Sequence, residues 1–194
     1  MSNPRHHSSR QTGFTMVEIL VTAVIIAFGL LGLAGLQAKM TVTQMEAYQR
    51  AHALVLVEDM VARINSQRGG AKSGSYVSSG GMTVVGTGTW SWLDCGIYYW
   101  LDSVPLADLC EWSRALRGAN TVDTSGRSLG GLIGARGCIE WRSNDPVTFR
   151  VSVAWQGLTD TQAPILPCGA DSLGRDNPMR RVLASEVILA NLEQ

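Results

Sequence analysis

The strongest hydrophobic pattern in the sequence lies near its N-terminus. The stretch from Ile19 to Ala38 contains 20 residues without a charge, most of them Leu, Val, Ile, Ala or Gly. As an α-helix this stretch is about 30 Å long, which matches the hydrocarbon core of a bilayer. It is longer than the apolar core of a secretory signal peptide, roughly 7 to 15 residues, and no small-x-small cleavage site follows it. The pattern therefore predicts a membrane helix that stays in the mature protein.

The pattern becomes amphipathic after Lys39. Apolar residues recur at helical spacing while charged residues occupy the other faces, as in Leu54, Val57, Val61 and Ile64 against Glu58, Asp59 and Arg63. Gly69 and Gly70 follow and are the expected stop. The sequence thus predicts one helix from Phe14 to about Gln67. Its first half needs lipid or other helices, and its second half needs a folded domain to lie against.

The remaining residues, 69–194, predict a small α+β domain with an antiparallel sheet. The segment Val147–Gln156 alternates apolar and polar side chains over five repeats, which is the period of a half-buried strand. Ser103 is the expected N-cap of a helix, with Pro105 in its first turn. The other expected elements are strands around Met82–Val85, Gly137–Arg142 and Arg181–Ala190, helical segments at Tyr98–Trp100 and Ser103–Leu116, and a turn at Asn144-Asp145-Pro146.

Charge and cysteine content narrow the class of protein. The 16 Lys and Arg balance the 16 Asp and Glu, so nothing indicates a nucleic-acid-binding surface. All four cysteines lie beyond the apolar stretch, which is typical of an exported domain with two disulfides. Three pairings are possible and the sequence does not choose among them, although local loops favour Cys95–Cys110 and Cys138–Cys168. A zinc site is the alternative, but CxxC is absent and the histidines are only His6, His7 and His52.

The residues before the apolar stretch indicate its orientation. Residues 1–13 contain Arg5 and Arg10 and no acidic residue, so the positive-inside rule places the chain beyond about residue 40 on the far side of the membrane. Glu18 is the one charge at the start of the stretch. It has two interpretations: an interfacial side chain favoured by the helix dipole, or a partner for the amine that cleavage after Gly13 would create at Phe14.

The segment Gly13-Phe14-Thr15-Met16-Val17-Glu18, followed by a long apolar helix, resembles the class III signal of type IV prepilins. The resemblance implies cleavage by prepilin peptidase after Gly13, N-methylation of Phe14 and a role for Glu18 in filament assembly. Four further segments resemble the PilV-type group of minor pilins, namely Ala27–Gln37, Val153–Gly157, Cys168-Gly169 and Arg180–Val182.

One departure concerns the helix itself. Many major pilins have a proline there, whereas residues 14–66 contain none. Gly29, Gly32 and Gly35 share one broad face, where they either allow close helix packing or simply reflect the frequency of glycine in membrane helices.

The resemblance implies a non-catalytic minor pilin with four regions: a cleaved leader at 1–13, a membrane and assembly helix at 14–38, an amphipathic helix at 39–68 and a head at 69–194. Its implied location is the inner membrane, with the head in the periplasm, and then the pilus. Its implied partners are prepilin peptidase, the inner-membrane assembly platform and other major and minor pilins, with no cofactor, metal or nucleic acid. The alternatives are a minor pseudopilin of type II secretion and a tip adhesin that uses the tryptophans of segment 90–112. Motifs of an enzyme are not found.

Overall fold

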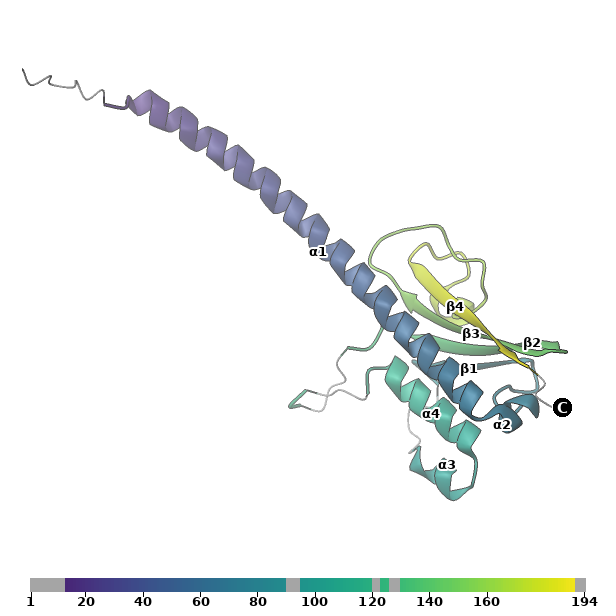
Figure 1. The fold of residues 1–194 in the computed structure, drawn as a ribbon. Coiled ribbons are helices and arrows are strands. Elements are labelled where there is room, and N and C mark those ends of the chain that lie inside the picture. Colours follow the sequence, from purple (N-terminus) through teal and green to yellow (C-terminus); the bar gives the residue numbers. More distant parts are fainter. Residues whose placement is uncertain (1–12, 90–94, 120–122, 126–129, 191–194) are drawn as a thin grey trace, which may run out of the picture. The chain divides into compact units, whose positions relative to one another are not determined.

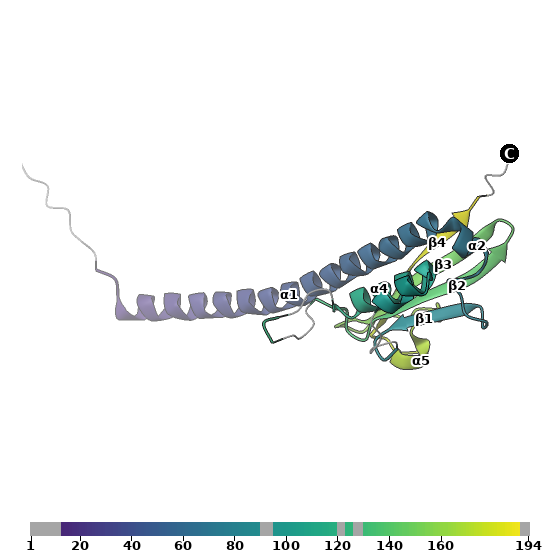
Figure 2. The same ribbon diagram turned by 90° about the horizontal axis from the view of Figure 1, so that it is seen from below.

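The computed structural model describes residues 13–89, 95–119, 123–125 and 130–190, and its chain divides into two units, Met1–Gln44 and Met45–Gln194. From here on, the head means this second unit, which contains the second part of α1 as well as the predicted head domain 69–194. Figure 1 shows the fold, and Figure 2 labels α5. In chain order the elements are α1 (Met16–Ser66), α2 (Arg68–Lys72), β1 (Met82–Gly86), α3 (Gly96–Trp100), α4 (Val104–Leu116), β2 (Arg136–Asn144), β3 (Val147–Gln156), α5 (Ala170–Leu173) and β4 (Arg180–Leu189). This is the α+β class that the sequence predicts.

The long helix α1 runs unbroken for 51 residues. Its end at Ser66 lies one residue before the predicted end, because Gln67 leaves helical geometry with φ −109° and ψ 48°. The prediction that Gly69 and Gly70 stop the helix is wrong, since both lie inside the short helix α2. A Cβ on Gly70 would lie 3.2 Å from the ring of Pro105. Glycine at this position therefore allows α2 to approach the start of α4.

The four strands form one antiparallel sheet in the order β1-β2-β3-β4. The predicted strands are confirmed, each within two residues of its expected ends. The hairpin between β2 and β3 turns at Asp145-Pro146, where the sequence predicts a turn. The register shifts between Trp141 and Ser143, so Arg142 is the extra residue of a β-bulge.

The inner face of the sheet carries the main hydrophobic core of the head. Figure 2 shows the head portion of α1 together with α4 on this side of the sheet. The alternating apolar residues of β3, namely Phe149, Val151, Val153 and Trp155, all belong to this core. Trp112 of α4 is fully buried, and its indole N–H donates a hydrogen bond of 2.8 Å to the carbonyl of Leu56 in α1. A Cβ on Gly137 would lie 2.5 Å from the Trp112 ring, so glycine in β2 makes room for it.

The outer face of the sheet is also covered, which the alternation of β3 does not predict. Ser152 and Ala154 point away from the main core and are nevertheless buried. Cys138, Ala154 and Cys168 form a second apolar cluster, flanked by Met82, Val84, Leu173 and Val182. The segment that contains Cys168 and α5 provides this cover, and in Figure 2 α5 lies on the side opposite α4. Residues far along the chain thus bury the face expected to meet solvent.

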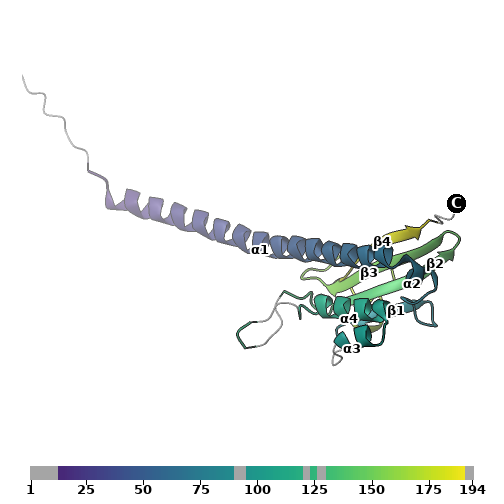
Figure 3. The same ribbon diagram turned by 60° about the horizontal axis from the view of Figure 1, so that its bottom comes forward.

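Helix α3 packs on α4, which itself lies against β1 and β2 on the inner face of the sheet; Figure 3 shows α3 beside α4. The predicted helical segments Tyr98–Trp100 and Ser103–Leu116 are confirmed, and Pro105 lies in the first turn of α4. Ser103 occupies the N-cap position, but its side chain makes no capping hydrogen bond. Instead its backbone N–H donates to the Tyr98 carbonyl at 3.0 Å. The expected capping role of its hydroxyl is therefore wrong.

Candidate functional site

The N-terminal end of α1 is built around a capping residue. Gly13, Phe14 and Thr15 precede the helix, and Phe14 is 81% exposed. The hydroxyl oxygen of Thr15 accepts a hydrogen bond of 3.3 Å from the backbone N–H of Glu18. A Thr three residues before a Glu is the pattern of a capping box, which satisfies N–H groups that have no partner in the helix. Thr15 is thus a local determinant of this end that the motif analysis missed.

Beyond Glu18 the helix is apolar and uncovered. Among the described residues, α1 is one helix that is long and apolar enough to cross a membrane by length and composition, and its most apolar window has no buried residue. Large apolar side chains are exposed all along it, including Val17, Ile19, Leu20, Ile25, Phe28, Leu31, Leu33 and Leu36. This exposure is the reverse of what a soluble core helix shows, so the segment requires lipid or other helices.

Small and hydroxylated residues within the apolar segment are compatible with an environment that excludes water. The Thr22 hydroxyl donates to the Ile19 carbonyl at 2.9 Å, so this polar group is satisfied inside its own helix. A Cβ placed on Gly29, Gly32 or Gly35 would meet no atom of the described residues within 4 Å. In a single chain these glycines therefore relieve no clash, and they leave a surface against which a second helix can pack closely.

Residues 8–34 match the family described as the prokaryotic N-terminal methylation motif. The chain carries a type IV pilin-like signal. The match includes Gly13, Phe14 and Glu18 and ends within the apolar part of α1. No curated protein and no solved structure matches the chain. The pilin-like motif and the apolar helix together fit membrane anchoring and association with a pilus.

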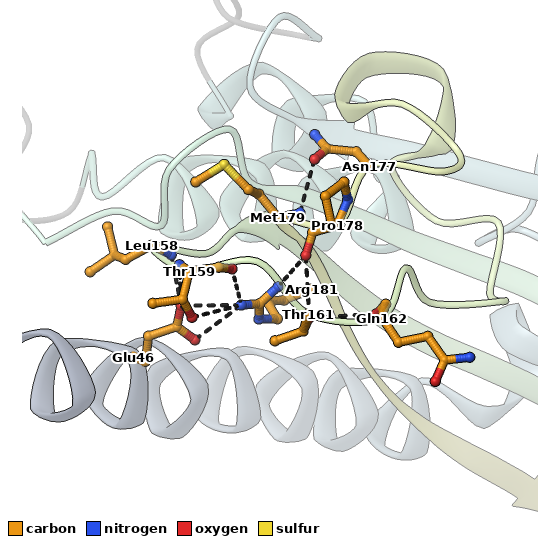
Figure 4. Close-up of polar contacts among 9 residues, drawn as sticks. All are labelled: Glu46, Leu158, Thr159, Thr161, Gln162, Asn177, Pro178, Met179 and Arg181. Atoms are coloured by element: carbon orange, nitrogen blue, oxygen red, sulfur yellow. Dashed lines mark hydrogen bonds and ion pairs between the residues drawn. The ribbon is translucent and has the colours of Figure 1, made fainter.

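A polar clasp ties the first turn of α1 in the head to two distant segments (Figure 4). The Oε1 atom of Glu46 accepts hydrogen bonds from the backbone N–H groups of Leu158 (2.7 Å) and Thr159 (2.9 Å) and from the Thr159 hydroxyl (3.0 Å). Arg181 completes the clasp with Nη2 at 3.2 Å. Burial alone would raise the pKa of Glu46, but these hydrogen bonds and the Arg181 charge together lower it below its ordinary value.

A second polar network joins α1 to α4 at the far end of the head. Arg63 contacts three carboxylates, those of Asp59 (3.1 Å), Asp108 (3.0 Å) and Glu111 (2.9 Å). The buried Tyr76 hydroxyl donates to Asp108 at 2.6 Å. Burial would lower the pKa of Arg63, yet the three carboxylates raise it, while burial and the Asp108 contact raise the pKa of Tyr76. The network thus holds both groups in their protonated forms.

Arg180 organises the segment that covers the outer face. Its side chain is fully buried and donates to four backbone carbonyls, those of Pro164, Leu166, Cys168 and Arg175, at 2.6 to 2.9 Å. Burial and the nearby Arg175 lower the pKa of Arg180. A guanidinium with several fixed donors suits a loop whose carbonyls converge without a regular element.

The predicted cysteine and tryptophan sites have different outcomes. The cysteines form the disulfides Cys95–Cys110 and Cys138–Cys168, the pairing that local loops favour. Trp112 lies in the core and Trp100 is 91% exposed on α3, so these two do not share a binding face. Trp90 and Trp92 lie outside the described residues. Because it is buried, Trp112 is not available to the binding platform that the adhesin alternative proposes.

The two other candidate sites are a metal site and His52. Among the residues that the structure describes, no group of three His, Cys, Asp or Glu side chains is arranged to hold a metal ion. His52 lies beside Tyr48 with ring centroids 6.1 Å apart, and its Nδ1 atom has no hydrogen-bond partner in the described part of the chain. Its position on α1 is that of a packing residue.

Proposed function

We propose that this chain is a PilV-type minor pilin, a non-catalytic subunit that helps to prime, assemble or modify type IV pili. The observation that carries the proposal is the methylation motif at residues 8–34, placed directly at the start of an uncovered apolar helix. A sheet-based head with two disulfides accompanies it. An exposed apolar helix of this length requires a membrane before assembly and a bundle of similar helices after assembly.

The proposed chemistry lies at the first turn of α1. Removal of the leader after Gly13 leaves a free amine on Phe14, which is then methylated. In the filament this ammonium pairs with Glu18 of the neighbouring subunit. At about 4 Å and an effective dielectric constant of about 20, two unit charges attract by about 4 kcal/mol. Because an unpaired carboxylate is costly in an apolar bundle, the pair sets the axial register of the helices.

The proposed partners follow from the two stages of this path. Prepilin peptidase and the assembly platform act in the inner membrane, where the head faces the periplasm. Major and minor pilins then contact residues 14–38. Gly29, Gly32 and Gly35 support close contacts there, because they leave room on the helix surface that no described residue of the subunit fills.

Two variants separate processing from assembly. Gly13→Asp should prevent leader removal, so that intact-mass analysis of the membrane-purified chain finds residues 1–13 still present. Glu18→Gln keeps the size of the side chain but removes its charge. It should be cleaved and methylated normally and yet be lost from sheared pili. Glu58→Gln, an exposed carboxylate on the same helix, is the matched control and should be incorporated as well as the wild type.

Three results would contradict the proposal. The first is normal incorporation of Glu18→Gln, and the second is retention of residues 1–13 in assembled fibres. The third is recovery of the wild-type chain only with a secretion system and never with pili, which would instead support the pseudopilin alternative.

A further inference from the structure

Helix α3 and the residue that follows it carry an apolar ridge, called the α3 ridge below, that the described part of the head leaves uncovered. Its members are Ile97, Trp100 and Leu101, whose exposed fractions are 50%, 91% and 66%. Their spacing of i, i+3 and i+4 places them on one face of a helical turn. Large apolar side chains gathered at a tip mark an interaction site more often than scattered ones do.

The ridge is held in a fixed shape. The Cys95–Cys110 disulfide joins the residue before α3 to α4, and the Leu101 N–H donates to the Ile97 carbonyl at 3.2 Å. Asp102 then takes a left-handed conformation with φ 54°, which turns the chain sharply into α4. A preformed ridge loses little conformational freedom on binding, which favours its use as a contact.

The head also contains a pocket that complements this ridge. The pocket has a volume of about 370 Å³ and lies beside β1, where Met82 and Val84 project from the outer face of the sheet. The opposite wall comes from the segment around α5. The pocket is lined by Met82, Val84, Pro167, Gly169, Ala170, Asp171 and Arg175. Most of this lining is apolar, and one acid and one base lie among it.

We propose that the α3 ridge of one head docks into this pocket of a second copy of the chain. An indole fits a pocket of this size and can bury roughly 150 to 250 Å² of surface there. Arg175 supplies a cation for the face of Trp100 and for the carboxylate of Asp102, which ends the ridge. Ridge and pocket lie on different layers of the head, since α3 contacts α4 on the inner side while the pocket opens on the outer face.

Such a contact is heterologous, because two different surfaces meet. Repetition of a heterologous contact gives a ring or an open helical array rather than a closed dimer. Three ridge residues bury less than the roughly 1,200 Å² of a stable complex, so the contact is weak between free molecules. When two copies are tethered in one membrane, their effective concentration is higher, and the weak contact can then form. The inference rests on the proposed function in one respect: it requires that several copies of the chain lie in the same membrane or filament.

Photo-crosslinking in native membranes tests the contact with the full chain. Trp100 is replaced by the photoreactive benzoylphenylalanine in a chain with one epitope tag, and a second copy carries another tag. The expected result is an adduct that contains both tags and maps by mass spectrometry to residues 167–175. The same probe at Ile188, a 60% exposed residue of β4, is the matched control and should give little of this adduct.

Two pocket variants sharpen the test. Ala170→Arg in the acceptor copy should lower the adduct yield by about tenfold, the factor that corresponds to 1.4 kcal/mol. Arg175→Glu changes an exposed residue and should also lower the yield, which keeps the test decisive if Ala170→Arg fails to fold. Adducts with lipid or with a different protein, an equal yield from Ile188, or no adduct would each overturn the proposal. Leader removal is measured on the same samples, so loss of docking is distinguished from loss of processing.

Discussion

The Glu46 clasp offers a direct test of how α1 is fixed in the head. Glu46→Ala removes the acceptor of three donors, the two N–H groups and the hydroxyl provided by Leu158 and Thr159, and it also removes the counter-charge of Arg181. Glu46→Gln is the finer change, because its carbonyl oxygen can still accept hydrogen bonds while its charge is lost. Comparison of the two variants separates the hydrogen bonds from the charge.

The expected size of the effect follows from exposure. A hydrogen bond to a charged group contributes about 1.5 to 3 kcal/mol, but Leu158 and Thr159 are exposed and their freed N–H groups can bind water. The Glu46 and Arg181 side chains are 23% and 15% exposed, so their ion pair is partly screened. We therefore expect Glu46→Ala to lower the free energy of unfolding by about 2 kcal/mol and Glu46→Gln by about 1 kcal/mol.

The pH dependence has a definite sign. The pKa of Glu46 is lower in the folded head than its ordinary value of 4.5, so its contribution to stability is fully present above that value. The contribution is lost as the pH falls from about 4.5 through the lower pKa of the folded state. The difference in stability between wild type and Glu46→Gln should therefore be constant at neutral pH and shrink in acid.

The assay is urea unfolding of the full chain in detergent micelles, followed by tryptophan fluorescence. Fluorescence is preferred to helical circular dichroism because detergent supports the apolar part of α1 whether or not the head is folded. Glu58→Gln on the same helix is the control and should leave the midpoint unchanged. Equal stabilities of wild type, Glu46→Gln and Glu46→Ala would refute the reasoning, as would a difference that grows in acid.

Three further changes probe the rest of the head by the same unfolding assay. Gly137→Ala should destabilise it by about 1 to 3 kcal/mol, because the new Cβ would lie 2.5 Å from the Trp112 ring; an unchanged midpoint would mean that the ring moves freely. The paired change Cys138→Ser and Cys168→Ser opens a loop with a sequence separation of 30 and should lower the free energy of unfolding by about 3.5 kcal/mol. A much smaller loss of stability when the wild type is reduced would contradict this value. Tyr76→Phe removes the hydroxyl from the polar network and should cost about 1 to 3 kcal/mol, whereas a stabilised variant would argue that the network is strained.

The elements that the sequence predicts are those with a strong local period. The apolar stretch of α1 and the alternation of Val147–Gln156 each repeat one spacing over many residues, so their type and extent follow from the pattern. The Gly69-Gly70 stop fails for the opposite reason. Whether glycine ends a helix or admits a close neighbour depends on what lies beside it, and here Pro105 comes from another element.

The polar contacts of the head depend on distances along the chain that no local pattern encodes. Glu46 and Arg181 are separated by 135 residues, and the sequence marks neither as a partner of the other. The adjacent pair Arg180 and Arg181 is equally instructive. Strand alternation puts them on opposite faces, yet only the cover over the outer face decides that Arg180 is fully buried. The processing site differs from both, because a short contiguous motif that includes Gly13, Phe14 and Glu18 makes it recognisable without any fold.

The placement of the two disulfides has a mechanical consequence. All four cysteines are used in bridges that lie beyond α1, so no covalent crosslink fastens this helix to the sheet. Apart from the backbone that continues from α1 through α2 into β1, tension applied along the helix reaches the rest of the head through side-chain packing and through bonds such as those of Glu46 and of Trp112 with Leu56. The head should therefore yield to a pulling force by letting its helix slip while both bridged regions stay intact. Such a subunit can reseat its helix once the load is removed.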